Sequence, residues 1–212
     1  MLKPFIVAID GRAASGKGTI SHIVAEKLGL DWLNTGLLYR AVAFIALKGG
    51  ISIHEYKELV QIAQNISLSD LEESHLYASH VGRFASIISS VPEVRQALFY
   101  MQRSFPVGKK GTVIEGRDIG TVIFPDADVK VFVTAELKER ARRRFVQLQN
   151  RGEKIIYESV LKDLQERDQR DEGRDCSPLQ IAKGSIVIDT TDLSVDESVS
   201  LVMSRINEVS SF

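Results

Sequence analysis

An apolar run followed by a glycine-rich loop stands at the start of the chain and most restricts how it can fold. Residues 5–19 read Phe-Ile-Val-Ala-Ile-Asp-Gly-Arg-Ala-Ala-Ser-Gly-Lys-Gly-Thr. The run 5–9 predicts a buried strand, and a helical pattern follows Gly16 and Lys17. A strand, a loop and a helix in this order bring backbone N–H groups together in front of a helix N-terminus. We therefore expect residues 11–19 to bind the phosphates of a nucleotide, with Lys17 adding a positive charge.

One position departs from the strict form of this motif. The strict form places Ser or Thr directly after the lysine, where its hydroxyl reaches Mg²⁺. Here Gly18 intervenes and Thr19 follows, an order that is not usual for GTPase switches. The alternative is a glycine-rich turn with a solvated lysine, but the position between a strand and a helix favours phosphate binding.

Composition excludes several other classes of protein. The 212 residues carry 27 Lys and Arg against 28 Asp and Glu, so the net charge of −1 gives no general attraction to nucleic acid or membranes. The single cysteine, Cys176, excludes an internal disulfide and a cysteine metal cluster. The apolar run 41–47 is too short to span a bilayer, and no signal peptide is visible. We expect a cytoplasmic, monomeric enzyme whose partners are small molecules.

Strand and helix patterns alternate along the chain. Strand patterns cover 5–9, 31–33, 112–115, 129–134 and 185–189, and helical patterns cover about 17–29, 36–48, 54–65, 91–104, 136–150, 155–173 and 195–209. Such alternation predicts an α/β fold with a parallel sheet covered on both faces. Ligands then bind at the carboxyl ends of the strands, so the residues after each strand are the candidate site.

The second and third strand patterns are each followed by polar residues. Thr35 occupies the expected helix N-cap position, and the guanidinium of Arg40 can hold a phosphate in a bidentate contact. After the third strand, Arg117 can neutralise phosphate oxygens, and Asp118 can accept a hydrogen bond from an exocyclic amine such as cytosine N4. The alternatives are a capped helix with a surface arginine and a tight turn with a local ion pair.

A charged helix follows near the C-terminal third of the chain. Arg167, Arg170 and Arg174 are spaced i, i+3, i+7 and share one helix face, as a lid that closes over a triphosphate requires. The alternative is a solvated helix with i,i+4 ion pairs. The arginines at 140, 142, 143 and 144 are expected to be mostly solvated. Taken alone, Arg95 is expected to lie on the surface.

Four segments together resemble the bacterial cytidylate kinases. They are residues 11–19, 35–40 (Thr-Gly-Leu-Leu-Tyr-Arg), 115–127 (Glu-Gly-Arg-Asp-Ile-Gly-Thr-Val-Ile-Phe-Pro-Asp-Ala) and 166–174 (Glu-Arg-Asp-Gln-Arg-Asp-Glu-Gly-Arg). The match covers nearly the whole chain in order. The resemblance implies a five-stranded P-loop kinase core, a monophosphate-binding insertion at about 34–106 and a mobile lid at about 150–178. It also implies transfer of the γ-phosphoryl group of ATP to CMP or dCMP, with Mg²⁺.

The resemblance also implies individual roles. The ATP phosphates would be held by Gly11, Arg12, Ala13, Ala14, Ser15, Gly16, Lys17, Gly18 and Thr19, and Mg²⁺ mainly by phosphates and water, with Thr19 the nearest protein oxygen. CMP would be held by Thr35, Arg40 and Arg117 at its phosphate, by Ser86, Arg95 and Asp118 at the base, and by Asp171 at the ribose or the lid side. Lys17, Arg117, Arg167 and Arg174 would be the catalytic residues.

Three departures from the family pattern leave alternatives open. Arg12 replaces a usual proline, Asn34 replaces an aspartate, and residues 66–85 offer little room for the small antiparallel sheet that family members often carry there. The acceptor could instead be UMP or a shikimate-like molecule. A nucleotide-binding switch without turnover is a further alternative, which the lack of an Asn-Lys-x-Asp guanine motif disfavours.

Overall fold

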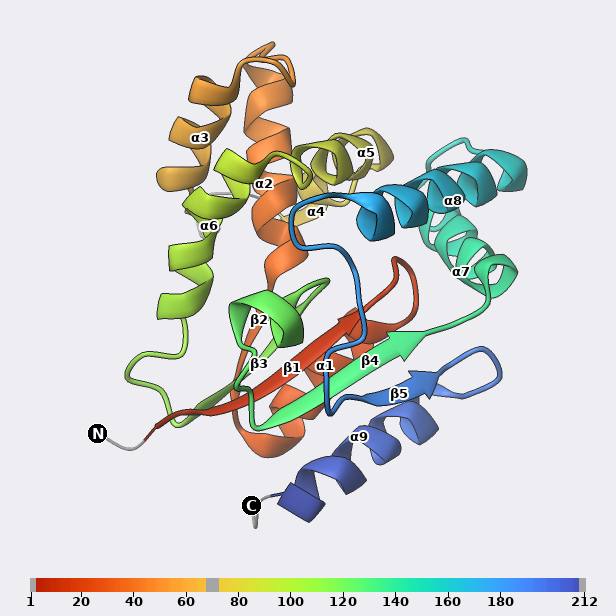
Figure 1. Ribbon diagram of the computed structural model, residues 1–212. Coiled ribbons are helices and arrows are strands. Elements are labelled where there is room, and N and C mark those ends of the chain that lie inside the picture. The colour runs from red at the N-terminus through yellow and green to blue at the C-terminus, as the bar shows by residue number, and fades with distance from the viewer. Residues whose placement is uncertain (1–2, 68–72, 210–212) are drawn as a thin grey trace.

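A parallel sheet of five strands forms the centre of the computed structural model, which describes residues 3–67 and 73–209 (Figure 1). The strands are β1 (Phe5–Gly11), β2 (Asp31–Asn34), β3 (Gly111–Gly116), β4 (Val129–Thr134) and β5 (Ile186–Asp189). They are ordered β2-β3-β1-β4-β5, and every neighbouring pair is parallel. All five strand predictions and the parallel α/β class are confirmed.

Helices connect these strands. Their bounds are α1 (Lys17–Leu28), α2 (Thr35–Lys48), α3 (Tyr56–Gln64), α4 (Glu73–Leu76), α5 (Ser79–Ile88), α6 (Pro92–Ser104), a π-helical turn η2 (Ile119–Ile123), α7 (Leu137–Gln149), α8 (Tyr157–Gly173) and α9 (Val195–Val209). The predicted helices are all present with ends shifted by up to two residues. The sequence patterns missed α4, α5 and η2.

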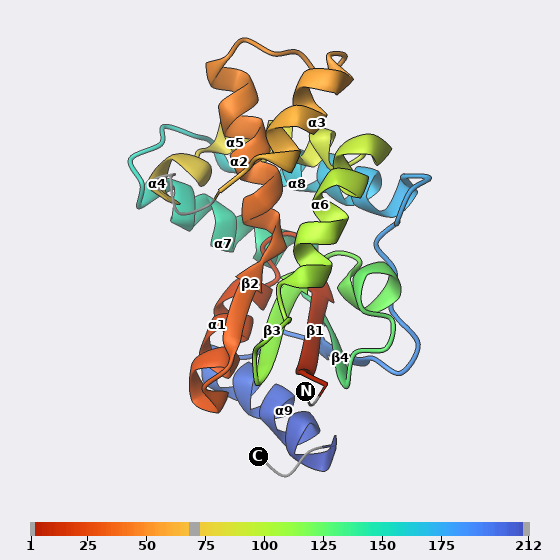
Figure 2. The same ribbon diagram turned by 90° about the vertical axis from the view of Figure 1, so that its left-hand side faces the viewer.

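The alternating side chains of β1 pack against different layers on the two faces of the sheet. Val7 and Ile9 belong to the apolar core that includes residues of α1 and α9, whereas Ile6 and Ala8 pack with residues of η2 and the end of α6. Figures 1 and 2 show α1 and α9 on one side of the strands and η2 on the other. Both faces are therefore covered, as predicted.

A second group of helices stands above the carboxyl ends of the strands (Figure 1). Helices α2, α3, α5 and α6 pack around their own apolar core, which includes Leu38, Leu59, Val81 and Leu98. The described part of 66–85 forms α4 and the start of α5 rather than strands, and 68–72 lie outside the described residues. Helices α7 and α8 pack together beside this group, so the strand ends lie between two helical walls.

No helix within residues 3–67 and 73–209 combines the length and the apolar character that crossing a membrane requires.

Candidate nucleotide-binding site

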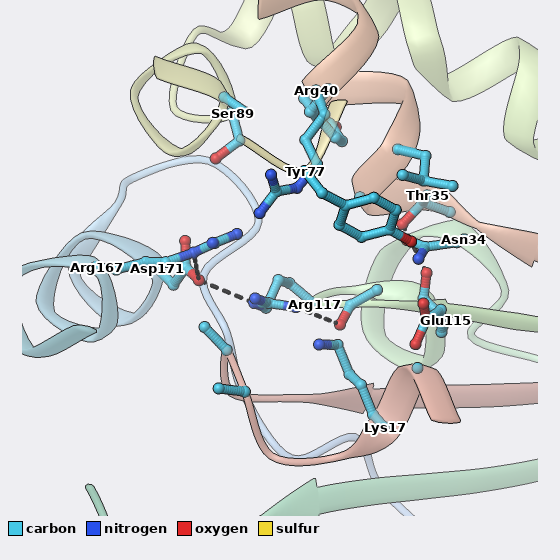
Figure 3. Close-up of a pocket in the computed structure, with 18 of the residues that line it drawn as sticks. Lys17, Asn34, Thr35, Arg40, Tyr77, Ser89, Glu115, Arg117, Arg167 and Asp171 are labelled. Carbon is cyan, nitrogen blue, oxygen red and sulfur yellow. Dashed lines mark hydrogen bonds and ion pairs between the residues drawn. The ribbon is translucent and has the colours of Figure 1, made fainter. Parts of the chain in front are cut away.

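A pocket of about 470 Å³ lies at the carboxyl ends of β1, β2 and β3 (Figure 3). Its walls come from the loop 13–19, the start of α2, the last two residues of β3 with Arg117 and Asp118 after them, and the inner side of α8. This is the edge of the sheet at which the sequence predicted a ligand site. Figure 3 shows the side chains of Lys17, Arg40, Arg117 and Arg167 directed into one space.

The loop between β1 and α1 owes its shape to residues with positive φ. Ala14 has φ 58° and Gly16 has φ 87°, and an added Cβ at Gly11 would lie 2.0 Å from the Val133 carbonyl oxygen. Glycine at position 11 therefore lets the loop pack against β4. Ala13, Ala14 and residues 16–19 line the pocket. The other members of the predicted ATP set do not line the pocket: Gly11 and Ser15 are buried, and Arg12 forms an ion pair with Glu172.

Lys17 lies on the floor of the pocket (Figure 3). Its ammonium donates a long hydrogen bond, of 3.4 Å, to the Arg12 carbonyl oxygen. Burial and the neighbouring charge of Arg117 lower the pKa of Lys17 to about 7. Burial also raises the pKa of nearby Glu115, although the charge of Lys17 opposes this. A bound polyanion would offset the cost of charging Lys17.

Three further side chains connect this floor to the edge of the sheet. The carboxylate of Glu115 accepts a hydrogen bond from the Ser21 hydroxyl at 3.2 Å, and the Ser21 oxygen accepts one from Trp32 Nε1 at 3.0 Å. The Trp32 ring lies 4.7 Å from the His22 ring, centroid to centroid. Trp32 and His22 both line the pocket.

Arg40 and Arg167 face each other across the pocket, and the negative charge near them does not balance their positive charge. Arg40, on α2, donates to the Leu76 carbonyl oxygen at 2.7 Å. Burial and the charge of Arg167 lower the pKa of Arg40 to about 9, and burial and the charge of Arg117 lower the pKa of Arg167 to about 10. Since like charges at these positions repel, the arrangement favours the binding of an anion between them.

Asp171 partly compensates this positive charge. Its Oδ2 lies 2.9 Å from Arg117 Nε and 3.7 Å from Arg167 Nε, in the contact drawn in Figure 3. Burial alone would raise the pKa of Asp171, but the two arginines outweigh it and hold the pKa below its usual range. Asp171 thereby holds Arg117 and Arg167 beside each other in the pocket.

Asp118 forms a second, deeper charged group with two arginines. Arg95 donates to Asp118 Oδ2, and Arg174 Nη2 lies 4.0 Å from Asp118 Oδ1. The expectation that Arg95 lies on the surface is wrong, because its side chain is 7% exposed. Its place one residue after buried Val94 and three before buried Leu98 was the available signal.

Two predicted CMP contacts have partners that the sequence did not indicate. Ser86 is buried and accepts a hydrogen bond from Arg170 at 2.8 Å, in a smaller pocket of about 60 Å³ beside the main one. Thr35 lines the main pocket but begins α2, and its hydroxyl donates to the Glu115 carbonyl oxygen at 2.7 Å. The prediction that Thr35 caps the helix is wrong, because Asn34 occupies that position.

The arginine stripe of α8 does not converge on one place. Arg167 and Arg174 line the main pocket, whereas Arg170 points into the smaller one. Arg174 follows the last residue of α8, where the chain is already extended. The i,i+7 spacing therefore does not describe its position correctly.

The expectation that the arginines of α7 are mostly solvated is wrong for two of them. Arg142 is exposed, as expected, but Arg140 is completely buried and Arg144 lines the main pocket. Burial and the charge of Arg151 lower the pKa of Arg144. Arg140 and Arg144 are spaced i, i+4 and flank the buried Ala141, so the helical pattern contained this information.

Comparison with known proteins identifies the family. The family model for cytidylate kinase matches residues 7–208. Proteins named cytidylate kinase from Methylocella silvestris (46% identical, covering 90% of this chain and 88% of that protein) and Cereibacter sphaeroides (45% identical, covering 95% of each) are similar along most of their length.

Solved structures with low sequence identity share the fold. A gluconokinase from Sinorhizobium meliloti aligns with a TM-score of 0.53 at 13% identity, covering 97% of this chain and 93% of its own. A shikimate kinase from Bacteroides thetaiotaomicron aligns with a TM-score of 0.52 at 11% identity, covering 96% and 98%. These two show the kinase fold alone, whereas the family model and the identities above 40% show that the chain belongs to the cytidylate kinase family.

Proposed function

We propose that this chain transfers the γ-phosphoryl group of ATP to CMP or dCMP, giving ADP and CDP or dCDP. Family membership supports the reaction class. The single structural observation that carries the proposal is the crowding of Lys17, Arg40, Arg117 and Arg167 in one pocket, with the pKa of three of them lowered. Two phosphorylated substrates bound together would supply the negative charge that this arrangement favours.

The donor phosphates belong at the loop 13–19. Its backbone N–H groups and the N-terminus of α1 favour negative charge, and Lys17 rises from the floor toward the same space. Arg174 and Arg167 line the opposite wall and would neutralise the transferring group.

The donor set near this loop fits a magnesium ion. Within the described residues no group of three His, Cys, Asp or Glu side chains could hold a metal by itself. Thr19 and Glu115 line the pocket beside Lys17, and a pair of protein oxygens with phosphates and water is typical of Mg²⁺. A bound Mg²⁺ would draw charge from the donor phosphates, and Thr19 and Glu115 would orient it.

The acceptor phosphate belongs between Arg40 and Arg117, with the Thr35 hydroxyl near by. Arg117 and Arg40 present planar donors that match phosphate oxygens. Asp171, which already holds Arg117, is placed to accept a hydrogen bond from a ribose hydroxyl. Thr35 and Arg40 belong to α2 and Asp171 to α8, which suits the predicted insertion at 34–106 and lid at 150–178, whereas Arg117 directly follows β3.

Asp118 and Arg95 offer a pattern that distinguishes cytosine from uracil. The carboxylate accepts a hydrogen bond from the exocyclic amine of cytosine, and the guanidinium donates to the acceptors on the same edge of the base. Uracil presents a carbonyl where cytosine has the amine, and this oxygen would face the carboxylate. Contact between Ser86 and the base remains a prediction: the Ser86 oxygen accepts from Arg170, and its hydroxyl hydrogen would donate to the base.

The reaction itself needs positioning more than covalent chemistry. The acceptor is already an anion, so no general base is required, and catalysis depends on in-line placement and charge neutralisation. Lys17 and Arg117 would hold the donor and acceptor phosphates, and Arg167 and Arg174 would close the space between them. Closure after both substrates have bound would keep water out and suppress hydrolysis of ATP.

A turnover screen tests this function. Purified protein is given ATP and Mg²⁺ with CMP, dCMP, UMP, AMP or shikimate, and ADP release is followed. We expect fast turnover with CMP or dCMP, much slower turnover with the others and almost none without an acceptor. Fast turnover with UMP or shikimate would contradict the assigned acceptor, and binding of ATP without turnover on any acceptor would favour the switch alternative. Lys17→Ala serves as the inactive control.

A further inference from the structure

Arg140 is a completely buried arginine that contacts three segments around the site without lining the pocket. Its Nε donates to the Ala135 carbonyl oxygen at 2.8 Å, at the end of β4. Its Nη1 donates to the Ala13 carbonyl oxygen in the phosphate loop at 3.3 Å. Its two terminal nitrogens also donate to the carboxylate of Asp168 on α8, at 3.1 and 2.7 Å.

The contact with Asp168 has the geometry of a bidentate ion pair. Two parallel N–H···O bonds fix the orientation of both groups as well as their distance. Asp168 directly follows Arg167 in α8 and precedes Asp171 by three residues. The same guanidinium that touches the phosphate loop therefore holds the turn of α8 that carries Arg167 and Asp171.

A second, exposed ion pair joins the same two parts of the molecule. Arg12 Nη2 in the phosphate loop lies 2.7 Å from Glu172 Oε1 in the last turn of α8. Arg12 does not line the pocket, so its place in the loop is better explained by this pair than by contact with ATP.

We propose that Arg140 is a positioning residue, which ties the phosphate loop to α8 so that Arg167 stands at the correct place over the donor phosphates, and that the Arg12–Glu172 pair reinforces this tie. The proposal rests on the proposed kinase function. Arg140 acts through α8 and touches no substrate. A displacement of α8 by about 1 Å would lower turnover by up to ~10²-fold.

A double-mutant cycle separates positioning from a general structural role. Asp168→Asn keeps the shape of the side chain but removes the charge that Arg140 grips. We expect it to lower kcat by about 10- to 100-fold, with little change in the KM for ATP. In an Arg167→Ala background the same substitution should lower kcat by less than about threefold, because the group being positioned is already absent. Equal factors in the two backgrounds would overturn the proposal.

Exchanging the charges of Arg12 and Glu172 provides a second test, which leaves the buried core unchanged. Arg12→Glu and Glu172→Arg should each lower kcat by a few-fold, as expected of an exposed ion pair. The double variant should recover activity toward the original value. Additive losses in the double variant would remove Arg12 from the proposal. If Asp168→Asn does not fold, Arg140→Lys, which retains the charge but not the fork, takes its place in the cycle.

Hydrogen exchange distinguishes failure of this inference from failure of the kinase function. If the unmodified protein turns over no acceptor, the proposed function is wrong. The effect of Arg140 on the stability of α8 and of the phosphate loop can still be measured. Arg140→Lys should then speed amide exchange in α8 and in the loop 11–19 and leave α9 unchanged. An unchanged α8, or equal acceleration in α9, would overturn the positioning role.

Discussion

Single residues in the site carry charge that the protein itself does not fully neutralise. Lys17 has one long hydrogen bond, and its pKa is lowered to about 7 by burial and by Arg117. Arg40 and Arg167 are perturbed in the same direction. These shifts have a common cause, because burial and like charge both disfavour the charged form. Bound phosphate should therefore change the protonation of the site as well as fill it.

The first prediction concerns proton uptake by Lys17. In the free protein Lys17 is mostly neutral above pH 7, and a bound polyphosphate raises its pKa, so nucleotide binding at pH 8 should take up close to one proton. Affinity for ADP should then fall by up to about tenfold for each pH unit above 7. Calorimetry at pH 8 in buffers of different ionisation enthalpy measures the uptake.

Lys17→Met is the matched control, because it keeps an unbranched side chain but cannot titrate. Its binding of ADP should be weaker and free of proton uptake. The assignment fails if the unmodified protein takes up no proton at pH 8.

The second prediction concerns Asp118 and the base of the acceptor. Asp118→Asn removes the carboxylate that we propose accepts from the cytosine amine, and it leaves Arg95 and Arg174 without their buried counter-charge. The affinity for CMP should fall by about 10- to 100-fold, since a hydrogen bond to a charged group contributes ~1.5–3 kcal/mol. The affinity for ATP should change much less, and calorimetry with each nucleotide measures both.

Asp126→Asn is the control, because Asp126 is an exposed carboxylate in the same segment. It should leave both affinities unchanged. Unchanged CMP affinity in Asp118→Asn would show that Asp118 does not contact the base.

Among the elements, α5 determines the position of Arg40. An added Cβ at Gly82 would lie 2.8 Å from one terminal nitrogen of Arg40 and 2.9 Å from the other. The guanidinium of Arg40 thus lies against the backbone of α5 at Gly82, and it also donates to the carbonyl oxygen of Leu76. Two helices that the sequence patterns missed, α4 and α5, therefore position a predicted phosphate ligand.

The third prediction follows from this contact. In Gly82→Ala the flexible guanidinium of Arg40 should move, whereas the helix gains up to about 1 kcal/mol of propensity. The melting temperature should stay equal or rise, and the KM for CMP should increase by roughly tenfold, the loss of one charged hydrogen bond. Thermal melting and steady-state kinetics measure the two effects.

Gly173→Ala controls for helix propensity, since an added Cβ there meets no atom within 4 Å. It should not raise the KM for CMP. A destabilised Gly82→Ala with an unchanged KM would contradict the role of α5.

The sequence predicted the elements whose pattern is local and missed those that depend on distant partners. Every strand was predicted, because buried strands read as short apolar runs between turn residues. In α5 the buried residues Val81, Ala85 and Ile88 do show helical spacing, so this omission was avoidable. The turn η2 was not predictable, since the Asp10 carboxylate binds the N–H groups of Ile119 and Gly120 across more than one hundred residues.

The same distinction applies to the site. The phosphate loop and Arg117 could be predicted as site candidates because a short run of consecutive residues contains the whole motif. The burial of Arg95 and Arg140 was indicated only by the helical spacing of their buried neighbours, and their partners Asp118 and Asp168, which lie 23 and 28 residues away, could not be predicted from that spacing. A buried arginine and a solvated one look alike until the partner is known.

Over the whole molecule, α8 is the element that joins the two walls of the site. It contacts α5 through the Ser86–Arg170 and Arg83–Asp163 pairs, each at 2.8 Å or less, and it contacts the phosphate loop through Arg140 and Arg12. These contacts connect the helices and the loop that carry the positively charged residues of both proposed substrate sites. Bound nucleotides should therefore stabilise all of these elements together.

The fourth prediction is a ligand-dependent rise in melting temperature. A ligand at one hundred times its Kd stabilises the folded state by about 2.7 kcal/mol, and 1 kcal/mol shifts the melting temperature of a chain of this size by roughly 2–4 °C. ADP and CMP should each raise it by about 5–10 °C at that saturation. Differential scanning fluorimetry measures the shifts, with AMP at equal concentration as the comparison for the acceptor side. An AMP shift as large as that of CMP would contradict the base preference.

The place of Trp32 gives the molecule an optical property. It is the single tryptophan of the chain, it lines the pocket, and its indole is hydrogen-bonded to Ser21 and lies beside the His22 ring. All tryptophan emission of the protein therefore originates at the nucleotide site. Ligand arrival can be followed by tryptophan fluorescence in rapid mixing, without a label and without a second tryptophan in the chain.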